Sequence, residues 1–246
     1  METPLHINRV QCAFVYQREL DIRKKAFEFE NKLTEYFNRQ PFSIIGVPDD
    51  ADPNIPRFEC RYKGDHLTVS QMRAVWEISF HDNIPIENIE TIISKRINSF
   101  SNILQVQVKK ILFAGIIIDS DSIFENENDI LTLFKENTKA TFLDNKNLKE
   151  YTIHYSVVYK ENFFLNIKCS KALKVEHKIT INRDRRTGEI KKGNSFNCLN
   201  LLLDINTKPL GTKEHAFDIK YVSELIENSL LLLSKTSIEN YLRGNI

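Results

Sequence analysis

The residues with the strongest claim to catalytic chemistry form a Glu176-His177-Lys178 triplet in a predicted strand. A metal-dependent nuclease of the restriction type holds its cation between carboxylates while a lysine assists the attacking water. Asp144 lies upstream of the triplet and is the candidate for the second carboxylate. However, Glu189-Ile190-Lys191 fits the same pattern, and such triplets arise easily by chance in a chain rich in lysine and glutamate. The triplet is therefore weak support for a nuclease.

Asp119 and Asp121 follow a strongly apolar segment and form a second candidate site. Carboxylates and waters are ligands that suit Mg²⁺, but an AspSerAspSer sequence after a strand is more typical of a turn and a helix N-cap. No pattern of a zinc protease, a serine hydrolase or a Cys-His nucleophile is present in the sequence. We therefore predict no catalytic residue, no metal and no cofactor, and enzymatic activity stays open.

Glycine is scarce and scattered, with seven residues in 246. Phosphate-binding loops need clustered glycines whose backbone amides can approach a pyrophosphate, so dinucleotide and P-loop chemistry are disfavoured. The cysteines are far apart, without a C-x-x-C pair that could open a zinc or redox site. They are typical of small buried apolar residues in a reducing compartment.

Charge gives no long-range preference for nucleic acid or anionic lipid, since 34 Lys and Arg balance 33 Asp and Glu. The first residues lack the basic segment followed by an apolar segment that is typical of a signal peptide. No apolar run is long enough for a membrane span. We therefore expect a cytoplasmic protein that does not enter a membrane.

The most distinctive charged feature is a predicted basic hairpin at 183–192. Such a ribbon can neutralise several phosphates and enter a nucleic-acid groove, which makes nucleic acid the alternative partner. The simpler interpretation is a solvated hairpin tip without a binding role. Asp184 and Glu189 would partly offset its positive charge. The residues expected to contact nucleic acid or a partner are Arg183, Arg185, Arg186, Lys191 and Lys192.

Two apolar surfaces are candidates for protein–protein contact. Tyr151, Tyr155 and Tyr159 fall on one face of an alternating strand, where they form either a recognition surface or ordinary cross-strand packing. Leu230 and Leu233 belong to a run of leucines that covers every side of a predicted helix. One side of that helix is therefore either buried within the fold or meets a second copy or another protein.

Hydrophobic periodicity predicts an α+β fold with antiparallel strands and helices on one face. Two topologically similar units are expected, 1–105 and a larger one at 106–246, each ordered as strand, helix, antiparallel strands and helix. In the first unit we expect strands at 7–16, 42–47, 57–62 and 66–80, and helices at 21–39 and 85–104. In the second we expect strands at 106–118, 151–159, 163–170, 175–181 and 195–204, a helix capped by Asp121 or Ser122, and a long C-terminal helix at 218–242.

Several short segments together resemble a sporadically distributed family of bacterial and archaeal proteins of unknown function. They are TPL at 3–5, FSIIGVPDD at 42–50, IPRF at 55–58, HLTVSQ at 66–71 and LLLDI at 201–205, before a terminal helix. The resemblance implies no active site. A sporadic distribution suggests exchange on mobile elements, and hence a genome-defence (antiviral) or toxin–antitoxin context.

Recognition surfaces are therefore plentiful and catalytic spacing is absent. We expect a non-catalytic binding or assembly protein that recognises a macromolecular partner, either a second copy of itself or another protein. The alternative is a nucleic-acid-binding or metal-dependent nuclease component that uses the basic hairpin.

Overall fold

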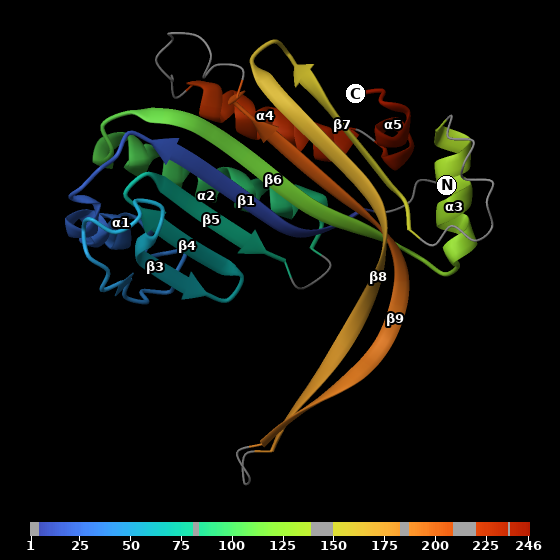
Figure 1. Ribbon diagram of the computed structural model, residues 1–246, viewed down its shortest axis with the longest axis horizontal. Helices are drawn as coiled ribbons and strands as arrows, with labels where there is room; N and C mark the ends of the chain where they lie inside the picture. The colour runs from blue at the N-terminus through green and yellow to red at the C-terminus, as the bar shows by residue number, and fades with distance from the viewer. Residues whose placement is uncertain (1–4, 81–83, 139–149, 183–186, 209–219, 236) are drawn as a thin grey trace.

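The computed structural model describes residues 5–80, 84–138, 150–182, 187–208, 220–235 and 237–246. At 86, 176–182, 187–192 and 235 it describes the backbone alone. Within these ranges the chain has an α+β fold, as the periodicity predicts, with one large antiparallel sheet and several helices (Figure 1).

The described residues form one continuous nine-stranded sheet, in the order β2-β3-β4-β5-β1-β6-β9-β8-β7. Every neighbouring pair is antiparallel. The strands are β1 (His6–Tyr16), β2 (Ser43–Ile44), β3 (Pro56–Tyr62), β4 (Asp65–Ser70), β5 (Arg73–Ser79), β6 (Ile111–Phe124), β7 (Thr152–Tyr159), β8 (Phe163–Asn182) and β9 (Thr187–Asn206). Because β1 pairs with β6, the sheet passes from the first part of the chain to the second without a break.

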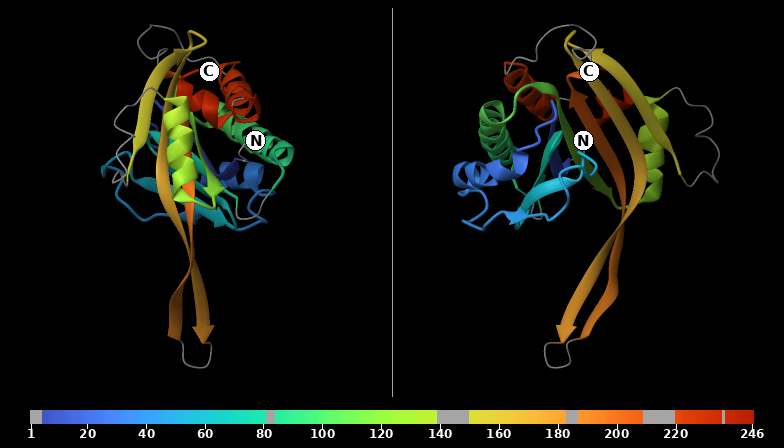
Figure 2. Two further views of the ribbon diagram at one scale, coloured as in Figure 1. Left: turned by 90° about the vertical axis from the view of Figure 1, so that its right-hand side faces the viewer. Right: turned by 60° about the vertical axis from the view of Figure 1, so that its left-hand side comes forward.

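The helices of the described residues leave one face of this sheet uncovered. They are α1 (Ala26–Leu33), which follows a 3-10 turn at Ile22–Lys25, α2 (Ile86–Gln107), α3 (Glu127–Asn137), α4 (Lys220–Lys235) and α5 (Ile238–Arg243). α1, α2 and α4 lie on the same side of the sheet (Figures 1 and 2). α3 and α5 contact each other at the end of the sheet where β7 lies.

The core lies between the sheet and these helices. Alternate residues of β1, including Val10, Cys12 and Phe14, are buried on the helix side, as expected for a strand with one covered face. Trp76 of β5 stacks on Phe37 at 5.4 Å between ring centroids and meets the edge of Phe100 of α2 at 5.7 Å. The polar residues of the same strands consequently gather on the uncovered face.

The expected strand at 66–80 is wrong, because it is two strands, β4 and β5, joined by a tight turn. The Ser70 hydroxyl accepts a hydrogen bond from the Arg73 backbone amide at 2.9 Å and donates to the Arg73 carbonyl at 3.0 Å. Apolar alternation continues on both sides of this turn, with Val69 and Ala74 both buried, so periodicity alone does not reveal it.

The expected helix cap at Asp121 or Ser122 is also wrong. β6 runs on to Phe124 because it keeps its register with β9 throughout, from Gly115 opposite Asn206 to Phe124 opposite Asn197. Ser120, buried on the helix side, donates to the Leu201 carbonyl at 3.1 Å, so polar residues here belong to the strand. The strand begins at Ile111, later than expected, since α2 extends to Gln107.

Three further elements differ in extent from the expectation. The segment 21–39 forms the 3-10 turn and α1, and then ends in a turn where Asn38 and Arg39 have positive φ. The strands expected at 163–170 and 175–181 form one strand, β8. The C-terminal helix is divided into α4 and α5, because Ser237 has an extended backbone and its side chain accepts a hydrogen bond from the Asn240 amide.

Candidate functional site

The hairpin of β8 and β9 continues well beyond the rest of the sheet (Figure 1). β7 pairs with β8 only as far as Ser170, and β6 pairs with β9 only from Asn197 onward. Farther out, residues 174–182 and 187–196 pair only with each other in the described part of the chain. We call this segment the ribbon. A two-stranded ribbon without a third strand is marginally stable in water.

The predicted basic residues belong to this ribbon. Lys191 and Lys192 are in β9, opposite Lys178 and His177 of β8. Arg183, Arg185 and Arg186 lie outside the described residues. The triplet 176–178 is described by its backbone alone, and Asp144 lies outside the described residues, so their role in a nuclease stays a prediction.

The predicted tyrosine row faces the helices. Tyr155 donates a hydrogen bond from its hydroxyl to the Tyr241 carbonyl of α5 at 2.6 Å, and burial raises its pKa to about 12. Tyr151 is buried against Phe134 of α3, with ring centroids 4.6 Å apart. Tyr159 packs half-buried against the core. The row therefore packs inside a single chain, and its role in binding a partner stays a prediction.

The leucines of the predicted run differ in how deeply they are buried. Leu233 is 5 % exposed and belongs to the core, while Leu230 is partly buried against it. A partner contact through Leu233 would thus require α4 to move, and this role also stays a prediction.

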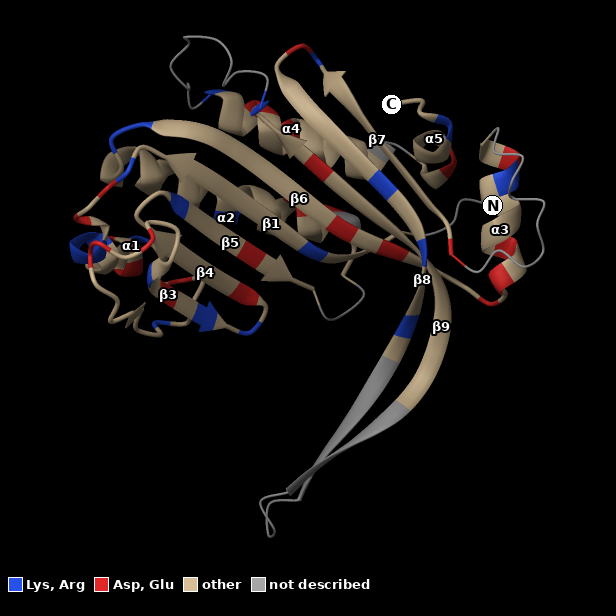
Figure 3. Cartoon of the chain, in the orientation of Figure 1, with Lys and Arg blue, Asp and Glu red and all other residues tan. Residues whose placement is uncertain are grey.

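The uncovered face of the sheet carries charges of both signs on β1, β5, β6 and β9 (Figure 3). At its centre Arg9 lies between two carboxylates, 3.4 Å from Glu77 and 3.5 Å from Asp119. Asn200 of β9 also donates to Asp119, at 2.8 Å. Within the described residues, no group of three or more His, Cys, Asp or Glu is arranged to hold a metal ion. The central carboxylates are instead satisfied by nitrogen donors of neighbouring strands.

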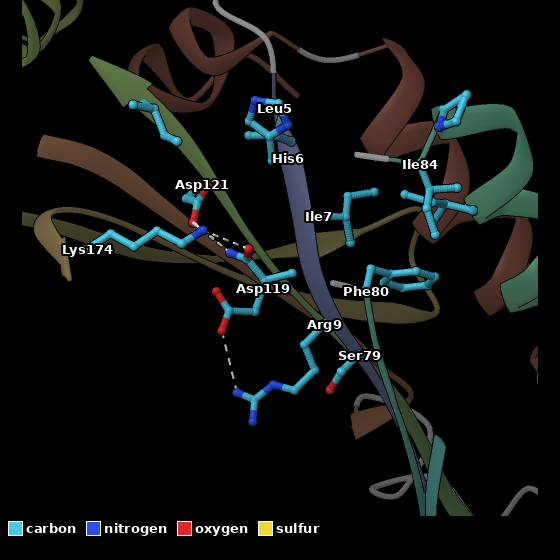
Figure 4. A pocket seen from close by; sticks show the side chains of 14 residues that line it. Leu5, His6, Ile7, Arg9, Ser79, Phe80, Ile84, Asp119, Asp121 and Lys174 are labelled. Atoms are coloured by element: carbon cyan, nitrogen blue, oxygen red, sulfur yellow. Dashed lines mark hydrogen bonds and ion pairs between the residues drawn. The ribbon is translucent and has the colours of Figure 1, made fainter. Parts of the chain in front are cut away.

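A cavity of about 730 Å³ opens where the start of β1 meets β6 and β8 (Figure 4). One wall is apolar and includes Ile7, Phe80 and Ile84, and the other carries Asp121 and Lys174. Sequence reasoning picked out Asp119 and Asp121 but missed Lys174 as the partner of Asp121, because Lys174 is an isolated lysine on another strand.

Asp121 is the most unusual residue of this cavity. One oxygen, Oδ2, accepts hydrogen bonds from Lys174 Nζ at 2.8 Å and from Asn8 Nδ2 at 2.9 Å. The other oxygen, Oδ1, is buried and has no hydrogen-bond partner in the described part of the chain. A buried carboxylate oxygen without a donor is costly, so this atom marks a place where a ligand donor would be stabilised.

The four cysteines are buried and free. Burial raises the pKa of the Cys60 thiol to about 11 and that of Cys169 to about 12. Thiols with raised pKa values are poor nucleophiles at neutral pH, because the thiolate is the reactive form. Cysteine chemistry is therefore unsupported at these positions.

Comparison with known proteins yields no relative. No protein-family model matches the chain, and no significant match is found among curated proteins or solved structures. The resemblance to the sporadically distributed family accordingly stays a hypothesis. Across the described residues, every helix is too short or too polar to cross a membrane.

Proposed function

We propose that this protein is a non-catalytic binding or assembly protein that takes up a strand from a protein partner at the free edge of β7. The observation that carries the proposal is the contrast between the two edges of the sheet. β2, at one edge, is two residues long, whereas β7, at the other, is eight residues long. In the described part of the chain β7 pairs only with β8.

The sequence of β7 lacks the features that normally protect an edge. Soluble proteins blunt exposed edge strands with charged residues, proline or bulges. β7 contains no Lys, Arg, Asp, Glu or Pro, and its register with β8 is unbroken. Val158, at the edge, is 65 % exposed. Such a strand favours recognition by main-chain hydrogen bonds to an added strand.

The strand order supports two topologically similar units, with the boundary near residues 105 and 106. Reading outward from the β1–β6 pair, one side runs β1, β5, β4, β3 and the other runs β6, β9, β8, β7. β7 then corresponds to β3, and β3 is covered by a further strand, β2. The partner strand would occupy the position beside β7 that β2 occupies beside β3.

The backbone pattern of β7 identifies the groups that would bind. Lys171 donates its amide to the Tyr151 carbonyl, which makes these residues a hydrogen-bonded pair. Because such pairs alternate along an antiparallel ladder, Tyr155 also bonds to β8, whereas the amides of His154, Ser156 and Val158 face the free edge. A partner strand would bond to these outward amides.

The test uses Ser156→Pro, which removes an outward amide and none that bonds to β8. Ser156→Ala is the matched control, since both variants lose the hydroxyl. The molar mass of the purified full chain, measured by light scattering, reports self-association. A different partner would be found among proteins that co-purify from the native host, starting with the products of neighbouring genes, as a defence or toxin–antitoxin context suggests.

We expect the proline variant, and not the alanine variant, to lose the assembly or the partner. Val158→Lys should have the same effect, because a lysine at an edge opposes strand pairing. An assembly that survives both changes would refute the β7 interface, and a monomer without any partner would refute the function itself.

A second candidate function, nucleic-acid binding, is favoured by the ribbon, which carries Lys191 and Lys192 and whose two strands, in the described part of the chain, pair only with each other. Charge reversal of Arg183, Arg185 and Arg186 should weaken binding to duplex DNA or RNA and flatten its salt dependence. Binding that is unchanged in the triple variant, or absent from the natural protein, would eliminate this candidate.

A further inference from the structure

We propose that the cavity at the start of β1 binds a primary ammonium ion carried on an apolar body, with one ammonium N–H donated to Asp121 Oδ1. This inference concerns a small ligand and is independent of the β7 edge, because it would hold whether or not a partner strand binds there.

The first step of the argument is the orphaned oxygen. Asp121 is 4 % exposed and lines the cavity, and its Oδ1 atom has no hydrogen-bond partner in the part of the chain that the structure describes. A carboxylate oxygen can only accept. The missing group is therefore a donor, and a charged N–H donor gives the stronger hydrogen bond.

The second step is the local charge. Arg9 forms ion pairs with two carboxylates, those of Glu77 and Asp119, and Lys174 forms one with Asp121. The formal charge of these five side chains is −1, and it belongs to the Arg9 group, since the Lys174–Asp121 pair is neutral. One additional positive charge would balance it, whereas an anionic ligand would add to the excess.

The third step is the shape of the cavity. Phe80, Ile84 and Ile7 line the side opposite Lys174 and Asp121 (Figure 4). Their apolar surface would remove a hydrocarbon chain from water, which is favourable in proportion to the area buried. A volume of about 730 Å³ is ample for a small organic ligand. His6, Asp119 and Asp121 all line the cavity, but no group of three or more His, Cys, Asp or Glu in the described residues is arranged to hold a metal ion.

The experiment is isothermal titration calorimetry of the full chain at neutral pH with three probes that share one apolar body: hexylammonium, hexan-1-ol and hexanoate. We expect saturable binding of one hexylammonium ion per chain. Hexan-1-ol should bind about tenfold more weakly, because a neutral donor replaces a charged one, and hexanoate should not bind. Equal binding of the alcohol, tighter binding of the carboxylate, or no binding of hexylammonium would each overturn the proposal.

Variants test the role of Asp121 itself. Asp121→Asn should weaken hexylammonium binding about tenfold. Asp204→Asn is the matched control on the same face, since both Asp204 oxygens already accept hydrogen bonds, from Asn166 and Asn206. It should leave the affinity unchanged. Lys174→Met should tighten binding, because it removes the internal ammonium that competes for the same carboxylate. An Asp204 effect as large as that of Asp121, or weaker binding to Lys174→Met, would contradict the site.

A buried substitution can prevent folding, so a measurement on the natural protein is needed as well. In amide NMR spectra, hexylammonium should shift resonances of residues 6–9, 79–80 and 119–123, which surround the cavity. Shifts confined to other regions would refute the location.

Discussion

Arg96 of α2 forms a bidentate ion pair with the buried carboxylate of Asp65 in β4. Its Nε donates to Oδ1 at 2.8 Å, and a terminal guanidinium nitrogen donates to Oδ2 at 3.0 Å. Trp76 of β5 donates its indole N–H to the same Oδ1 atom at 2.8 Å. One carboxylate thus joins a helix and two strands on the covered side of the sheet.

Replacing Arg96 by methionine should therefore destabilise the protein strongly. The buried Asp65 charge would lose its ion-pair partner, and breaking a buried pair typically costs about 3–5 kcal/mol. Urea unfolding monitored by Trp76 fluorescence measures the change. Arg61→Met is a suitable control, because Arg61 is exposed, and a loss as large as that of Arg96→Met would show that the ion pair is not the cause.

Gly64 should not tolerate a side chain. A Cβ atom at this position would lie 2.2 Å from the backbone carbonyl oxygen of Ser79. Ser79 is held there because its amide donates a hydrogen bond to the Gly64 carbonyl at 2.8 Å. Gly64→Ala should cost about 1–3 kcal/mol, in the range of overpacking. Gly46→Ala, where nothing lies within 4 Å of the added atom, should be nearly neutral in the same thermal unfolding assay. Equal melting temperatures for the two variants would contradict the clash.

The hydrogen bond from Tyr155 to the Tyr241 carbonyl should anchor α5 to β7. Tyr155→Phe keeps the ring but leaves the carbonyl without this donor, so we expect a loss of about 1 kcal/mol. Hydrogen exchange should accelerate in α5 more than in α2. An equal acceleration of exchange in both helices would mean that the bond does not hold α5 in place.

Alkaline pH should destabilise the fold through its buried thiols and phenols. Burial raises the pKa of Cys169 from 9.0 to about 12, so the folded state retains a proton that the unfolded state loses. This stabilisation is complete below pH 9 and declines as the pH rises from 9 toward 12. Tyr151, raised from 10.0 to about 12, adds the same trend at higher pH. Urea unfolding across this range should show falling stability, with a smaller fall in Cys169→Ala, and constant stability would contradict the shifts.

The alternation of Tyr151 to Tyr159 was sufficient to predict β7, because a strand with one covered face alternates in burial. The apolar stripe of 85–104 likewise predicted α2. Both patterns are local and repeat over several turns or pleats. The turn at Ser70 was missed because it interrupts neither the alternation of apolar residues nor the run of strand-forming residues.

The sequence by itself determined the α+β class and the strand-rich second part. Tertiary structure decided that the described strands join in one sheet, that β7 is its last strand among the described residues and that Lys174 and Asn8 meet Asp121. The physical reason is register. The alternation of side chains within a strand is a local property. Which residue lies opposite which depends instead on the pairing of β1, β6, β9 and β8. Segments more than fifty residues apart along the chain are brought together only by burying their common apolar face.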